Sequence, residues 1–168
     1  MAFTTLRDLM FDFNSSDDLS EQCYTESDLN KLLVELGTKL PTKEYKILEL
    51  LGKGGFAQVR HGTHIKTNEK IACKQLLRNK QDSNRLYQEI TILSAISNHS
   101  SVLPLLDVLY NSSEIWLIFP LAEKDLFDFI KQNGKLPEEL AKYYFRTIVD
   151  IVSYCHLKNI VHRYILFI

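Results

Sequence analysis

The chain has 168 residues, of which 45% are hydrophobic and 24% are charged, and its formal net charge at pH 7 is −1. This composition is typical of a soluble globular protein that holds one ordinary domain, or a small domain and a piece of another. The small net charge gives no electrostatic reason to expect nucleic acid or a membrane as partner, and no apolar run reaches the roughly eighteen residues of a membrane span.

Three cysteines, Cys23, Cys73 and Cys155, lie far apart and lack the spacing of metal ligands. Their odd number and scatter indicate reduced thiols inside a cell. The N-terminus also lacks the charged-then-apolar order of a secretory signal. We therefore expect a cytoplasmic protein, with the nucleus as the alternative compartment.

The start of the chain is acidic, because residues 1–30 carry seven acidic side chains and a single basic one, Arg7. Residues 1–24 are also rich in Ser, Asp and Asn, a composition that opposes compact packing. We expect these residues to form an acidic leader that is disordered or loosely attached.

Residues 25–42 are predicted to form a short helix and a linker. Thr25 and Asp28 have the spacing of a capping box, and leucines follow at helical spacing at positions 29, 32, 33 and 36. Gly37 supplies a C′ stop, and Pro41 follows shortly after. Two interpretations stay open: a helix that simply docks on the domain, and a regulatory or partner-binding helix.

A glycine-rich stretch lies between two predicted strands. The apolar run Ile47–Leu51 precedes Gly52, Gly54 and Gly55, and the residues after Ala57 also read as extended. Without side chains, such a loop lets backbone N–H groups contact phosphate oxygens. A dinucleotide-binding loop would be followed directly by a helix. Since none is predicted here, the glycines are expected at the tip of a hairpin.

This stretch resembles the nucleotide-covering loop of protein kinases, and Ala72-Cys73-Lys74 resembles the Ala-x-Lys of their third strand. The resemblance implies that Phe56 lies at the loop tip and that Val59 packs over the base. Ala57 stands where the family has its third glycine, and a methyl group still fits there. The residues thereby implied in nucleotide binding are Leu51, Gly52, Lys53, Gly54, Gly55, Phe56, Ala57, Val59, Ala72 and Lys74.

A helix is predicted from Asn84 to Ser97, with Asp82-Ser83 as its N-cap signal. Glu89 lies within its apolar stripe, so its carboxylate needs a partner unless it faces solvent. Lys74 is the natural candidate. The kinase resemblance implies the same pair, with the lysine held against the α- and β-phosphates and Glu89 supporting it.

Two further strands, residues 102–110 and 114–120, are expected to be joined by a turn at Asn111-Ser112-Ser113. The second is almost continuously apolar and therefore central in the sheet. The resemblance implies that Phe119, at its end, borders the back of an adenine pocket.

Residues 120–124 resemble the hinge between the two kinase lobes. The resemblance implies that the Pro120 carbonyl accepts a hydrogen bond from the adenine edge and that the Ala122 N–H donates one, because proline lacks only its N–H. Asp125 follows, and two roles stay open for it: an acceptor for the ribose hydroxyls, and the N-cap of a helix over Leu126–Gln132.

Two helices are predicted after the hinge. Asn133-Gly134 ends the first, and Pro137 opens the second, which runs from Glu138 to about His156. The second helix carries a wide apolar stripe at positions 140, 144, 148, 151, 152 and 155. If the lobe around it is incomplete, this stripe stays exposed and lowers the solubility of the chain.

Ile160-Val161-His162-Arg163 resembles the start of a kinase catalytic loop, but Tyr164 stands at the position of the catalytic Asp. A tyrosine hydroxyl, neutral at physiological pH, cannot replace that carboxylate. The family's Asn and Asp-Phe-Gly magnesium ligands have no counterpart either. We therefore expect no catalytic residue, no metal ligand and no phosphoryl transfer in this chain. Residues 164–168 match nothing in the family, which suggests a truncation, either biological or an artefact of the gene model.

The expected fold class is α+β: a kinase-like N-terminal lobe over residues 43–119, with a five-stranded antiparallel sheet and one helix. The hinge is residues 120–124, and residues 125–163 supply the first two helices of an incomplete C-terminal lobe. The function implied is that of a serine/threonine protein kinase, similar to the calmodulin-dependent group, with ATP as cofactor and a protein substrate of unknown identity. The alternative is a truncated pseudokinase that binds nucleotide or a partner without catalysis.

Overall fold

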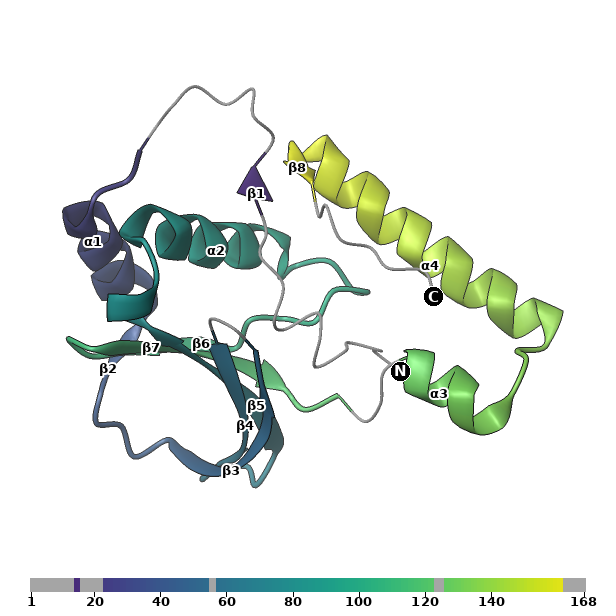
Figure 1. Ribbon diagram of the computed structural model, residues 1–168, viewed down its shortest axis with the longest axis horizontal. Coiled ribbons are helices and arrows are strands. Elements are labelled where there is room, and N and C mark those ends of the chain that lie inside the picture. The colour runs from purple at the N-terminus through teal and green to yellow at the C-terminus, as the bar shows by residue number, and fades with distance from the viewer. Residues whose placement is uncertain (1–13, 16–22, 55–56, 123–125, 162–168) are drawn as a thin grey trace.

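The computed structural model describes residues 14–15, 23–54, 57–122 and 126–161 (Figure 1). A six-stranded sheet in the order β2-β6-β7-β5-β4-β3 carries helices α1 and α2 on one face, and α3 and α4 lie beyond its end. The helices are α1 (Glu26–Leu36), α2 (Ser83–Ile96), α3 (Leu126–Asn133) and α4 (Glu138–Leu157). The sheet consists of β2 (Thr38–Lys39), β3 (Tyr45–Lys53), β4 (Ala57–His64), β5 (Lys70–Leu77), β6 (Asp107–Tyr110) and β7 (Glu114–Pro120).

Five of these strands pair antiparallel, as the sequence predicted. The sixth, β2, lies parallel to β6 at the sheet edge, and the Leu40 N–H donates to the Tyr110 carbonyl over 2.8 Å. The sheet is therefore mixed rather than purely antiparallel. The strand expected over residues 102–110 is also shorter, because regular pairing begins only at Asp107. Pro104 has no N–H to contribute to a ladder.

Alternation along the strands gives the sheet two apolar faces. The face under α1 and α2 forms the main core, which includes Ala57, Val59, Ala72, Leu76, Leu86, Ile90, Val108, Ile115, Leu117 and Phe119. The opposite face carries Ile71, Cys73, Leu109, Trp116 and Ile118, against which Tyr45 and Ile47 of β3 pack. Because both faces of β7 are covered, its residues 115–119 form a continuous apolar run.

Helix α1 begins with the predicted capping box. The Thr25 N–H donates to Asp28 Oδ2 over 3.0 Å, and the Asp28 N–H donates to Thr25 Oγ1 over 3.3 Å. Leu29 and Leu33 are fully buried in the main core, whereas Leu36 is 42% exposed. The predicted leucine stripe thus faces the domain through its first two turns.

Gly37 ends α1 for a different reason than the sequence suggested. A C′ glycine commonly adopts a left-handed conformation, but Gly37 is extended, with φ −117°. A Cβ at this position would lie 2.7 Å from the Val108 carbonyl oxygen and 2.8 Å from that of Leu33. Glycine is needed because the end of α1 packs against the backbone of β6 with no room for a side chain.

Helix α2 links the sheet to the second group of helices. Leu86 and Ile90 face the sheet, while Ile92 and Ile96 pack with residues of α4 and of the short strand β8 (Ile160–Val161). Asp82 is the N-cap, as predicted, but its side chain makes no capping hydrogen bond. α2 therefore contacts both parts of the molecule.

Helices α3 and α4 begin and end within one residue of the predicted positions. The Gly134 N–H donates to the Ile130 carbonyl over 2.8 Å with φ +80°, and Pro137 is the N-cap of α4. On α4, Cys155 is the buried residue, whereas Phe145 is 60% and Leu157 82% exposed. Its described surface includes a shallow groove lined by Phe145, Ile148, Val149, Val152, Ser153, His156 and Leu157.

The acidic leader is attached to the domain where the structure describes it. The backbone of β1 (Asn14–Ser15) pairs antiparallel with β8, and the Tyr24 ring stacks on that of Tyr87, with ring centres 3.8 Å apart. Residues 1–13 and 16–22 of the predicted leader lie outside the described residues, so the loose attachment of the leader stays a prediction. In the described part of the chain, no helix combines the length and the apolar character that crossing a membrane requires.

Candidate functional site

The glycine-rich stretch forms the turn of a hairpin between β3 and β4. Gly52 lies opposite Val59 and Lys53 opposite Gln58, and the Gly54 N–H donates to the Ala57 carbonyl over 2.9 Å. No helix follows this turn, as the sequence predicted. Leu51 and Lys53 are exposed, whereas Gly52 and Gly54 are half-buried. Gly55 and Phe56 lie outside the described residues.

Four of the predicted site residues share one face of the sheet. Val59 lies opposite Lys74, and Ala72 lies opposite Phe119, and directly opposed residues on neighbouring strands point to the same face. All four are buried, each being at most 3% exposed. Ala57, 9% exposed, lies on the same face at the start of β4. The sheet thus brings together residues from three strands.

Lys74 and Glu89 form the predicted ion pair. The Lys74 Nζ donates to Glu89 Oε1 over 2.5 Å, and the two residues are 3% and 2% exposed. They are the buried charged side chains of the described chain. Withdrawing both charges from water is costly, so their mutual attraction has to offset most of that cost. The pair fixes the ammonium group on the site face of β5.

Cys73 points away from this site. It lies between Ala72 and Lys74 on β5, so its side chain belongs to the opposite core, where it is fully buried. Burial raises the pKa of the Cys73 thiol to about 12. A thiol held in its neutral form is a poor nucleophile, so Cys73 contributes packing rather than chemistry.

Of the predicted hinge, residues 120–124, the structure describes residues 120–122. Pro120 is the last residue of β7 and lies opposite Ile71, and the Leu121 N–H donates to the Lys70 carbonyl over 3.1 Å. Pro120 and Ala122 are both half-buried. Asp125, with its two alternative roles of ribose acceptor and helix cap, lies outside the described residues.

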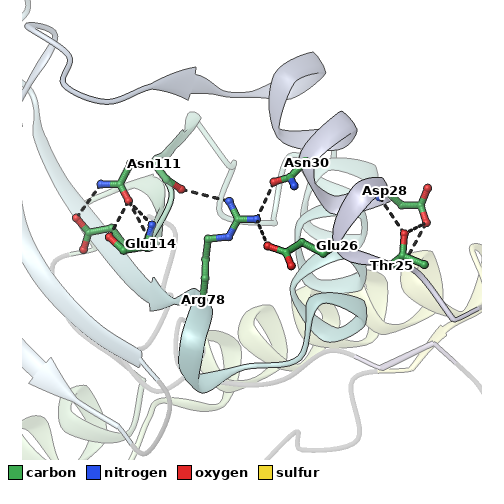
Figure 2. Close-up of polar contacts among 8 residues, drawn as sticks. Thr25, Glu26, Asp28, Asn30, Arg78, Asn111 and Glu114 are labelled. Carbon is green, nitrogen blue, oxygen red and sulfur yellow. Dashed lines mark hydrogen bonds and ion pairs between the residues drawn. The ribbon is translucent and has the colours of Figure 1, made fainter.

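Arg78 is a structural centre that the sequence did not reveal. It lies in the 3-10 turn η2 (Arg78–Lys80) before α2, and its guanidinium donates to Asn30 Oδ1 over 2.7 Å and to the Asn111 carbonyl over 3.2 Å (Figure 2). Glu26 is 3.3 Å from the same group. In the sequence, Arg78-Asn79-Lys80-Gln81 reads as an ordinary polar loop, so no signal marked it.

His162, Arg163 and Tyr164, which resemble part of a kinase catalytic loop, lie outside the described part of the chain. Within the part that is described, no group of three or more His, Cys, Asp or Glu side chains could hold a metal ion. The described site is therefore a glycine turn, an anchored ammonium group and an apolar sheet face. This arrangement could bind a phosphorylated ligand with a flat apolar group.

Comparison with known proteins gives a consistent result. A family model described as the protein kinase domain matches residues 45–165. The carbon catabolite-derepressing protein kinase of Candida albicans is 39% identical over 123 residues, or 71% of this chain. The SNF1-like protein kinase ssp2 of Schizosaccharomyces pombe is 32% identical over 150 residues, or 87% of the chain. The CBL-interacting serine/threonine-protein kinase 16 of Arabidopsis thaliana is 33% identical over 126 residues, or 71% of it.

These relatives are much longer than the stretch they share with this chain. The similar region covers 20% of the Candida albicans protein, 26% of the Schizosaccharomyces pombe protein and 27% of the Arabidopsis thaliana protein. The chain thus spans about a fifth to a quarter of the curated relatives that it matches.

Proposed function

The chain belongs to the protein kinase family, of the serine/threonine type, and from this premise we propose that it binds ATP between the glycine hairpin and the sheet face beneath it. The activity of the whole protein would then be phosphoryl transfer to serine and threonine hydroxyls of a protein substrate. The observation that carries this proposal is the buried Lys74–Glu89 pair directly opposite Val59, beside the glycine turn.

The described residues fit the parts of ATP. Lys74 offers a cation to the phosphates, and Glu89 keeps that cation in place. The backbone of Gly52 and Gly54 can approach phosphate oxygens without side-chain interference. The small side chain of Ala72, next to Val59, suits an adenine ring lying flat on the sheet. When bound, ATP supplies the phosphoryl group that is transferred.

The remaining assignments concern the adenine edge and the ribose. The Pro120 carbonyl would accept from the adenine amino group, and the Ala122 N–H would donate to the ring. Phe119, buried at 2% exposure, would close the back of the pocket. Leu51, Lys53, Gly55, Phe56 and Ala57 would complete the loop, and Asp125 would accept from the ribose.

Calorimetric titration of the full chain with Mg-ATP tests this proposal. Lys74→Met should remove binding because the phosphates lose their cation, and Ala72→Phe should remove it by filling the adenine position. Lys70→Met is the matched control, because Lys70 is exposed at the start of the same strand. Equal ATP affinity in all three variants would contradict the assignment.

A second candidate function, a non-catalytic nucleotide- or partner-binding module, is favoured by Tyr164 at the position of the catalytic Asp. Transfer of labelled phosphate from ATP to a serine/threonine peptide separates the two functions. Nucleotide-dependent thermal stabilisation without turnover would support the binding module. Turnover by the unmodified chain would contradict this role for Tyr164, and gain of turnover in Tyr164→Asp would support it.

A further inference from the structure

Helix α1 lies before the residues that the kinase family model matches. The kinase family model begins at residue 45, whereas α1 covers Glu26–Leu36 and is preceded by Tyr24. Figure 1 shows α1 beside α2, at the edge of the sheet where β2 and β6 lie. Its place in the structure therefore needs its own explanation.

The first contact of this segment is with the beginning of α2. The Tyr24 ring stacks on Tyr87 with ring centres 3.8 Å apart and an interplanar angle of 16°. The Tyr24 N–H donates to Asn84 Oδ1 over 3.0 Å. Asn84 and Tyr87 belong to the first turns of α2, just before Glu89. The segment is thus fixed to the half of α2 that carries the paired carboxylate.

The second contact is apolar. Leu29 and Leu33 of α1 are 0% exposed and share the main core with Leu86 and Ile90 of α2. Leu86 and Ile90 flank Glu89 in the helix, so the position of these side chains determines where the Glu89 carboxylate lies. Close packing of the core leaves little freedom to rotate α2 without moving α1.

The third contact joins α1 to the connection before α2. Arg78 donates to Asn30 of α1 and to the Asn111 carbonyl in the β6–β7 turn, and Figure 2 shows its guanidinium between the two. The Arg78 side chain is 12% exposed; its hydrogen bond to the Asn111 carbonyl is partly buried, whereas the one to Asn30 is exposed. The entry of the chain into α2 is therefore held from the α1 side as well.

We propose that residues 24–37 are an intramolecular positioning element, which fixes the orientation of α2 and thereby keeps Glu89 on Lys74. The C-terminal half of α2 is held separately, by Ile92 and Ile96 against α4 and β8. Loss of the α1 contacts then allows the N-terminal half, with Glu89, to move away from the sheet. The importance of this element for nucleotide binding rests on the proposed function, but the mechanical coupling does not.

The chemical reactivity of the Lys74 amine tests the coupling without nucleotide. The full chain is treated with a lysine-acylating reagent, and the rate of Lys74 modification is measured by mass spectrometry relative to the exposed Lys70. Tyr24→Ala removes the ring stack, and Leu33→Ala removes part of the buried packing. Val34→Ala is the matched control, because Val34 lies on the same helix and is 72% exposed.

Cys73 reports whether the fold itself is lost, because it is 0% exposed on the other face of the same strand. In Tyr24→Ala we expect Lys74 acylation to rise by about tenfold, a factor equivalent to about 1.4 kcal/mol, while Cys73 stays unreactive to a thiol reagent. In a Glu89→Gln background, Tyr24→Ala should add nothing, because the partner it positions is already changed.

Unchanged Lys74 reactivity in Tyr24→Ala would overturn the proposal, as would equal effects of Tyr24→Ala in the presence and absence of Glu89. If Leu33→Ala exposes Cys73 and Lys74 together, that variant has unfolded, and Tyr24→Ala decides the question. Failure of ATP to bind any variant would refute the proposed function and leave the coupling between α1 and α2 intact.

Discussion

The Lys74 ammonium and the Glu89 carboxylate lie 2.5 Å apart, with the residues 3% and 2% exposed, on a strand and a helix that meet only through tertiary packing. Burial affects a single charge and an apolar replacement of the pair differently. Each charge alone would be strongly destabilised by burial, yet two apolar side chains in the same space would pack without any desolvation cost. Stability alone therefore does not explain why charged residues occupy these positions.

Substitution of one partner should destabilise the fold much more than substitution of both. Glu89→Ala leaves the Lys74 ammonium buried and unpaired, so we expect the free energy of unfolding to fall by about 3–5 kcal/mol. The double variant Lys74→Met, Glu89→Leu should be close to neutral. Urea unfolding followed by circular dichroism measures both. Glu35→Ala on α1, where Glu35 is exposed, is the control, and a Glu89→Ala cost as small as this control would be inconsistent with a buried pair.

Helix α1 should contribute directly to domain stability. Leu33→Ala removes a fully buried side chain from the main core, which typically costs about 2–5 kcal/mol. Val34→Ala changes a residue that is 72% exposed, so its effect should stay within about 0.5 kcal/mol. Calorimetry measures the melting temperatures of the Leu33→Ala and Val34→Ala variants. Similar melting temperatures for the two variants would show that α1 is not part of the cooperative unit.

Gly37 should tolerate no side chain. In Gly37→Ala the new Cβ would meet the Val108 carbonyl oxygen at 2.7 Å, and a backbone atom cannot move aside as a side chain can. We expect a loss of about 1–3 kcal/mol, typical of overpacking. Hydrogen exchange should accelerate in α1 and β6. Gly134→Ala is the comparison: nothing lies within 4 Å of its Cβ, so its strain comes only from φ +80° and should affect the end of α3 alone.

Alkaline pH should destabilise the domain through Cys73. Burial raises the pKa of its thiol from 9.0 to about 12. The unfolded chain releases this proton near pH 9, whereas the folded chain keeps it until near pH 12. The stabilisation is therefore complete below pH 9 and is lost as the pH rises through this window. Urea midpoints between pH 8 and pH 11, in the range set by these pKa values, should fall less steeply in Cys73→Ala. The exposed Cys23 provides the control, since Cys23→Ala should keep the original slope.

The outer surface of α4 should promote self-association. Phe145 and Leu157 are 60% and 82% exposed and border the same shallow groove. Contiguous apolar surface of this kind favours contact with other molecules. Phe145→Lys combined with Leu157→Lys should raise the soluble concentration without lowering the melting temperature. Light scattering during concentration measures this effect, and Lys142→Ala, at an exposed residue that does not line the groove, serves as control. An unchanged tendency to associate would exclude this surface as the cause.

Local signals in the sequence predicted much of the fold, because their physical causes are local. The capping box at Thr25, the left-handed stop at Gly134 and the hairpin at the glycines each depend on a few adjacent residues. Glu89 was predictable for another reason. A carboxylate inside an apolar stripe needs a cationic partner, and the kinase resemblance implied that this partner is Lys74.

The features that the sequence did not reveal depend on contacts between distant segments. β2 has only two residues and exists because Leu40 meets Tyr110 across the sheet edge. The extended conformation of Gly37 results from the proximity of Val108. The role of Arg78 depends on Asn30 and Asn111, which lie far from it in the chain. None of these distant contacts produces a recognisable pattern in the sequence around β2, Gly37 or Arg78.

The pairing of β1 with β8 brings together Asn14 and Val161, which lie near opposite ends of the described chain. Closing so large a loop costs more entropy than any other strand pairing in the described part of the molecule, and two residues on each side give little enthalpy in return. This pairing should consequently form last during refolding and open first under native conditions. Its amide protons should exchange with deuterium long before those of β5, which makes the contact a sensitive reporter of the earliest opening of the domain.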